Sequence, residues 1–106
     1  MFCSFDKQPL ILRLYGDAKI IHPRDEQWDA CHELIPGFTG ARQFYQMNIE
    51  MVQNSCGYAV PHYEFKNERQ TLTNWAEKKG RSGVEEYWSE KNLSSIDGYD
   101  SNILKV

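Results

Sequence analysis

Tyr45-Gln46-Met47-Asn48-Ile49-Glu50-Met51 is the stretch that decides the fold class, because apolar and polar side chains alternate in it at every step. A period of two residues predicts a strand with one buried and one polar face. Residues 10–15, in which three leucines occupy every second position, predict another strand. Gly16 indicates a bulge or bend, after which residues 19–22 continue extended. Long bent strands of this kind are typical of barrels.

Two shorter strands complete the predicted sheet. Residues 1–5 form an apolar run. Residues 58–60 resume the strand pattern after a break at residues 54–57, and residues 62–65, after Pro61, are expected as a last short strand. The total is about four antiparallel strands, whereas small barrels need roughly five to eight. Unpaired edges of long strands are normally covered in soluble proteins. We therefore expect an incomplete β-barrel whose missing strands come from a preceding N-terminal segment or from a second chain.

Helical spacing is present in two further regions. Residues 23–35 begin with a proline and two acidic side chains, repeat apolar residues at intervals of three and four, and meet a Pro-Gly pair at 36–37. Residues 68–79 show the same spacing up to Gly80, which predicts a helix that stops there.

A third helix is predicted to begin at Ser82, because Ser82 and Glu85 have the spacing of a capping box. The chain as a whole is then a single α+β domain covering residues 1–106. Residues 1–65 would supply the barrel strands and one helix. Residues 66–106 would supply the two C-terminal helices and a polar tail.

Composition narrows the class of protein. Hydrophobic residues make up 41% and charged residues 25% of the 106 residues, which is typical of a globular domain. The formal net charge of -3 leaves no basic excess for binding nucleic acid, so we expect no nucleic-acid partner. No apolar run approaches a membrane span, and we see no signal peptide. The three cysteines are widely spaced, which favours free thiols and a cytoplasmic location.

Individual side chains leave alternatives open. Cysteine and histidine pairs at metal-ligand spacing are absent, so no metal site is predicted. Cys56 is either a reactive thiol or a small buried residue at a strand break. Arg13, on a strand, either binds a phosphate or pairs with a carboxylate across the sheet.

Several motifs together resemble one family. They include Ser-Cys-Gly-Tyr-Ala-Val-Pro at residues 55–61, Trp-Ala-Glu-Lys-Lys-Gly at residues 75–80 and Ser-Ile-Asp-Gly at residues 95–98. The sequence is similar to pyridoxamine 5′-phosphate oxidase-related, FMN-binding split-barrel proteins, over nearly its whole length. The resemblance implies a split barrel, a homodimer with FMN at the subunit interface, and a preceding segment that supplies further strands and the main phosphate contacts.

The resemblance also implies a set of cofactor-binding residues, although it identifies no catalytic residue. The C-terminal tryptophan and arginine motif of true pyridoxamine phosphate oxidases is absent, so a vitamin B6 substrate is not implied. The residues that the resemblance places near FMN are Arg13, Gln53, Ser55, Cys56 and Tyr58.

Two functional hypotheses follow from these expectations. In the first, the chain belongs to an FMN-dependent oxidoreductase of pyridoxamine phosphate oxidase type but lacks much of the cofactor site. The flavin would then supply the redox chemistry. In the second, the chain is a non-catalytic dimerisation or interaction module, a truncated or split-gene remnant whose exposed strand edges drive association.

Overall fold

The computed structural model describes residues 1–35 and 39–105. The chain divides into two compact units, each built from two separate segments. Residues 1–19 and 45–68 form the first, which we call the sheet unit. Residues 20–44 and 69–106 form the second, the helical unit.

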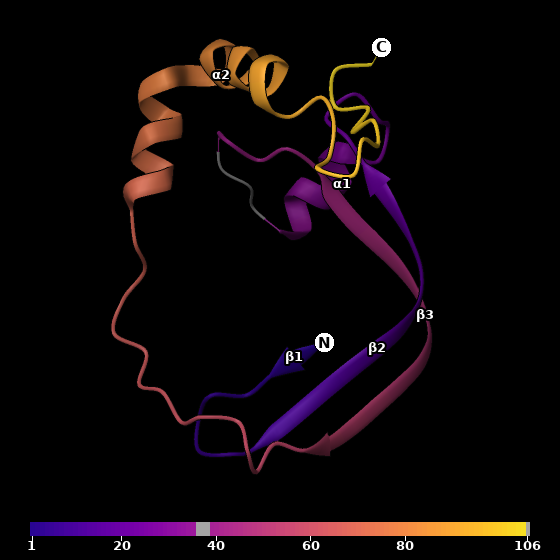
Figure 1. Cartoon of the computed structure of the whole chain (residues 1–106), viewed down its shortest axis with the longest axis vertical. Coiled ribbons are helices and arrows are strands. Elements are labelled where there is room, and N and C mark those ends of the chain that lie inside the picture. The colour runs from indigo at the N-terminus through magenta and orange to yellow at the C-terminus, as the bar shows by residue number, and fades with distance from the viewer. Residues whose placement is uncertain (36–38, 106) are drawn as a thin grey trace. The chain divides into compact units, whose positions relative to one another are not determined.

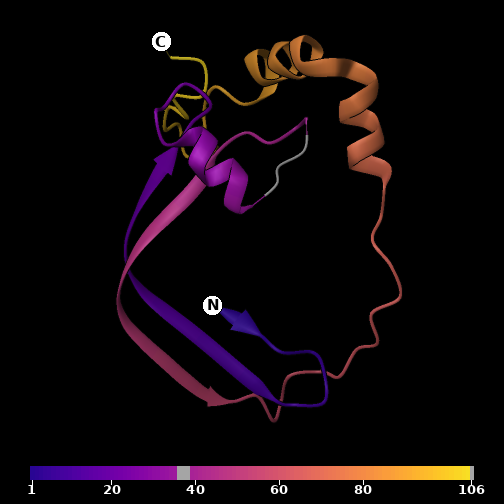
Figure 2. The same ribbon diagram turned by 180° about the vertical axis from the view of Figure 1, so that it is seen from behind.

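The described residues form one sheet of three strands, in the order β1 (Phe2–Cys3), β2 (Leu10–Ile21) and β3 (Phe44–Cys56). β1 is antiparallel to β2, with Phe2 opposite Leu12. β2 and β3 run side by side in opposite directions (Figure 1), and the view from behind shows the same pairing (Figure 2). The expected mixture of helix and antiparallel sheet is therefore present.

The prediction of a fourth strand at residues 58–65 is wrong for the part of the chain that the structure describes. Residues 58–60 form a turn closed by a hydrogen bond from the Val60 N–H to the Gly57 carbonyl, at 2.8 Å. Pro61 has no backbone N–H that could donate a hydrogen bond to a neighbouring strand. The following residues run without regular structure, although the Tyr63 N–H donates to the Phe5 carbonyl at 2.8 Å.

The break predicted at residues 54–57 comes later than expected, because β3 extends past Asn54 as far as Cys56. At Gly16, where a bulge or bend within a continuing strand was predicted, β2 does continue without interruption. At Gly16 the strands lie very close together, because a Cβ built there would stand 1.8 Å from the Asn48 carbonyl oxygen. The glycine therefore permits a close approach of two backbones.

Helix α1 (Trp28–Leu34) begins later than the predicted start at residue 23. Residues 23–27 form turns instead. The Asp25 carboxylate accepts a hydrogen bond from the His22 N–H at 2.7 Å, and the Trp28 N–H donates to the Asp25 carbonyl at 2.9 Å. Local side-chain bonds of this kind compete with a helical turn. The Pro-Gly stop predicted at residues 36–37 lies outside the described residues.

Helix α2 (Thr71–Lys91) replaces the two C-terminal helices that were predicted, so the described residues form two helices rather than three. Gly80 does interrupt the helical backbone, with φ 67° and ψ 174°, but the helix resumes at once after this kink. Glu85, expected in a capping box with Ser82, has its carboxylate 2.7 Å from Arg81 Nε, which donates to it.

The hydrophobic core lies in the helical unit. It contains Ala76, Val84 and Trp88 from α2 together with Ile103 from the C-terminal tail, and Trp75 packs against it. The sheet unit has no buried hydrophobic side chain among its described residues. Within the described part of the chain, no helix is long and apolar enough to cross a membrane.

Candidate functional site

Four polar side chains on β2 and β3 form a cluster on the sheet, which we call the sheet polar cluster. Arg13 and Tyr15 are two residues apart on β2, and Gln53 and Ser55 are two residues apart on β3, so each pair shares one face of its strand. Arg13 Nη1 donates to Ser55 Oγ at 2.8 Å. The Tyr15 hydroxyl donates to Gln53 Oε1 at a longer 3.4 Å. The strands thus connect all four side chains in two cross-strand pairs.

The side chain that Arg13 contacts distinguishes between its two predicted roles, phosphate binding and pairing with a carboxylate across the sheet. Across the sheet it meets a hydroxyl, and among the residues that the structure describes no carboxylate forms an ion pair with it. A guanidinium has five N–H donors, and Ser55 accepts from one of them. The contact with Ser55 is part-buried, so the charge is held in place while further donors stay open to an anion.

Three of the five residues that were predicted to bind the cofactor lie in this cluster, namely Arg13, Gln53 and Ser55. The other two do not join it. Cys56 follows Ser55 directly on β3, so the alternation of the strand places it on the opposite face, where its thiol is free and exposed. Tyr58 lies in the turn after the strand with 84% of its surface exposed.

The sequence prediction missed Tyr15 as a member of the cluster. A usable signal was present, because Tyr15 stands two residues after Arg13 and must share its face of the strand.

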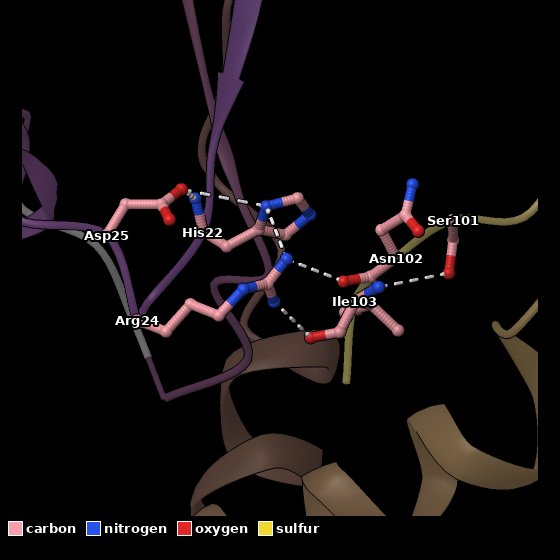
Figure 3. A network of polar contacts seen from close by, with 6 residues as sticks. All are labelled: His22, Arg24, Asp25, Ser101, Asn102 and Ile103. Carbon is pink, nitrogen blue, oxygen red and sulfur yellow. Dashed lines mark hydrogen bonds and ion pairs between the residues drawn. The ribbon is translucent and has the colours of Figure 1, made fainter. Parts of the chain in front are cut away.

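A second polar network lies in the helical unit and joins the residues after β2 to the C-terminal tail (Figure 3). The Arg24 guanidinium donates to the Asn102 carbonyl at 2.8 Å and to the Ile103 carbonyl at 3.2 Å. The same guanidinium lies 3.3 Å from His22 Nδ1, and the Asp25 carboxylate lies 3.7 Å from that nitrogen. We call these three side chains the tail clamp.

Two side chains of the tail clamp, Arg24 and Asp25, meet the buried His22 ring at its Nδ1 nitrogen. Nε2 is buried without a hydrogen-bond partner among the described residues. The clamp holds backbone carbonyls of its own chain, and these contacts indicate a structural role.

Metal ligands do not gather anywhere in residues 1–35 and 39–105, where no group of three His, Cys, Asp or Glu side chains could hold an ion together. The thiols of Cys3, Cys31 and Cys56 are all free.

Comparison with known proteins gives one informative match. The chain is 30% identical over 113 aligned positions to the Pyridoxamine 5′-phosphate oxidase family protein ustO of Aspergillus flavus. The alignment covers 92% of this chain and 45% of that protein, so the chain spans less than half the length of this relative. No family model matches the chain, and no solved structure gives a significant match.

Proposed function

We propose that this chain is part of an FMN-binding split-barrel protein of the pyridoxamine 5′-phosphate oxidase type, and that its sheet polar cluster faces the cofactor. The observation that supports this most directly is the pairing of Arg13 with Ser55, because three of the residues expected beside FMN converge on one sheet face. The similarity to a named member of that family supports the same assignment.

The donor set of the cluster suits FMN. A flavin offers carbonyl and ring-nitrogen acceptors along one edge and an anionic phosphate on its side chain. Arg13 supplies charged N–H donors, Gln53 an amide that both donates and accepts, and Ser55 a hydroxyl. When bound, FMN would supply the redox chemistry of an oxidoreductase, while these side chains bind and orient it.

The cluster would need a second wall to enclose a cofactor. Small-molecule sites usually bury most of the ligand surface. In the sheet unit, the cluster stands on strands with no buried hydrophobic side chain among the described residues. We therefore propose that a second copy of the chain, or further polypeptide of the same protein, completes the site.

FMN titration of the purified chain tests the proposal, with flavin fluorescence as the readout. We expect saturable quenching that weakens about tenfold in Arg13→Gln, because a charge-assisted hydrogen bond is lost. Arg69→Gln is the matched control, since Arg69 is exposed and outside the sheet polar cluster. Unchanged fluorescence at saturating FMN would show that this chain does not bind the cofactor.

A non-catalytic association module is the second candidate function, and one observation favours it. Tyr45, Met47, Ile49 and Met51 present an apolar row along β3, and each is at least 41% exposed. A row of this kind normally lies in an interface. Sedimentation of the chain with and without FMN separates the two candidates, because only the first predicts that the flavin migrates with the protein.

A further inference from the structure

An aromatic pocket lies in the helical unit, separate from the sheet polar cluster. It has a volume of about 360 Å³ and is lined by side chains on both sides of the α2 kink and by residues that precede β3. We call it the aromatic pocket and define it by Arg42, Trp75, Tyr87, Trp88 and Asn92.

The kink at Gly80 creates this pocket. Trp75 precedes it and Tyr87 follows it, and in a straight helix twelve residues would separate them by about 18 Å along the axis. In the bent helix their ring centroids are 5.2 Å apart and the rings meet edge to face at 79°. The two rings therefore adjoin each other in the lining of the pocket. Trp88 also lines it but is only 5% exposed, and the Arg81 guanidinium lies 4.9 Å from the centroid of its ring.

One positively charged side chain, Arg42, lines the aromatic pocket. Arg42 is exposed, with no ion pair to any carboxylate among the described residues. Lys79 Nζ lies 5.5 Å from the centroid of the Trp75 ring. The nearby Glu85 carboxylate is already paired with Arg81 at 2.7 Å. An anion entering the pocket would therefore meet an uncompensated cation.

We propose that the aromatic pocket is a binding site for a planar aromatic carboxylate of one or two rings, whose carboxylate pairs with Arg42. Aromatic walls favour a flat ring by stacked or edge-to-face contact, and a guanidinium matches a carboxylate with two parallel N–H donors. The volume lies at the lower end of the range for small-molecule sites, which suits a compact ligand. This inference does not depend on the proposed flavin function.

The three tryptophans allow a direct test by NMR of the indole N–H signals. Trp75 and Trp88 line the aromatic pocket, whereas Trp28 packs against Phe44 with ring centroids 4.7 Å apart and serves as the internal reference. The probe is 2-naphthoate, and its neutral amide 2-naphthamide is the matched ligand. We expect 2-naphthoate to shift the Trp75 and Trp88 signals saturably while the Trp28 signal stays in place.

The charge requirement is tested by two variants. Arg42→Gln should weaken 2-naphthoate binding about tenfold, to the level of the amide, whereas Arg69→Gln should leave it unchanged. The proposal is overturned by any of three results: no saturable shift, equal binding of acid and amide, or wild-type affinity in Arg42→Gln. Equal shifts of all three tryptophans would also overturn it, because binding would then not be confined to this pocket.

Discussion

Arg24 links distant parts of the sequence at the scale of a single residue. Its guanidinium meets two tail carbonyls and the His22 ring at distances between 2.8 and 3.3 Å. A planar guanidinium can serve three acceptors at once, which the compact ammonium of lysine cannot do in the same geometry.

Arg24→Lys should therefore destabilise the helical unit by about 1–3 kcal/mol, since part-buried carbonyls lose their donors. The loss should also raise the hydrogen-exchange rate of the amides at 101–105. Arg69→Lys, at an exposed position, should stay within about 0.5 kcal/mol of the wild type. Equal denaturation midpoints for Arg24→Lys and the wild type would contradict a stabilising clamp.

Asp100 makes the stability of the C-terminal tail dependent on pH. A hydrogen bond from Lys105, followed by one from the Asn102 N–H, lowers the pKa of this carboxyl below its ordinary value of 3.8. A lowered pKa in the folded state means that the contribution to stability is complete above 3.8 and disappears as the pH falls through the folded value.

Acidification below pH 3.8 should therefore loosen the end of the tail. The amide signal of Asn102 reports it, because that N–H donates to Asp100 at 2.8 Å. In Asp100→Asn the same signal should lose most of its pH dependence in this range. A titration curve unchanged by the substitution would show that another carboxyl is responsible.

At the residue level, the family resemblance implied that Arg13, Gln53 and Ser55 lie beside FMN, and this contact stays a prediction. The structure shows that β2 and β3 bring the three side chains onto one face of the sheet. The tail clamp could not be predicted, because Arg24 recognises backbone carbonyls 78 and 79 residues away. Every residue has a backbone carbonyl, so the sequence does not show which carbonyls will accept a hydrogen bond from a distant side chain.

Gly80 determines the shape of α2 at the scale of the element. Its φ of 67° with ψ of 174° falls in a region that essentially only glycine occupies. No atom would touch a Cβ placed there, so the constraint is conformational and not steric crowding by neighbours.

Gly80→Ala should therefore cost about 1–3 kcal/mol in unfolding free energy, or force the helix to straighten and separate Trp75 from Tyr87. Thermal melting and the near-ultraviolet signal of the aromatic rings measure the two effects. Gly83→Ala is the matched control in the same helix. Replacing glycine by alanine inside a helix usually raises stability, but a Cβ at position 83 would lie only 3.2 Å from Lys79 Cβ. The two effects oppose each other, so the net change in unfolding free energy should be small.

Prediction of the elements was best for the long, strongly periodic strands. Gly80 and Gly16 were both recognised as special positions. Gly80 does interrupt the helical backbone, but helical structure resumes directly after the kink, and Gly16 lies where the β2 and β3 backbones approach closely. A glycine in the sequence indicates that the backbone there adopts an unusual conformation or approaches another segment closely. Which of the two applies depends on tertiary contacts.

The distribution of buried surface is uneven at the scale of the whole molecule. Buried hydrophobic side chains belong to the helical unit, whereas β3 is exposed from Tyr45 to Asn54. Burial of apolar area is the main source of stability, which is why we propose that further polypeptide covers the sheet unit. The expectation of an incomplete barrel rested on a count of four strands, whereas the described residues form an open sheet of three, and the barrel itself stays a prediction.

Substitution on β3 tests whether further polypeptide covers the sheet unit. Ile49→Lys should reduce self-association seen in sedimentation velocity and lower the dependence of the melting temperature on protein concentration, because a charge enters the apolar row. Asn48→Lys places the same charge on the other face of the strand and should have a smaller effect. A wild-type chain that remains a folded monomer at all concentrations would argue against the covering partner.

The interleaving of the two units limits how this protein can be dissected. The chain passes from one unit to the other after residues 19, 44 and 68, so neither unit corresponds to a contiguous fragment. A protease cut after residue 44 would divide both units, whereas a cut after residue 19 would divide the sheet unit and a cut after residue 68 the helical unit. The shortest fragment that contains the whole sheet unit, 1–68, also carries residues 20–44 of the helical unit. Complementation between halves split after residue 44 is therefore a better approach than isolating either unit.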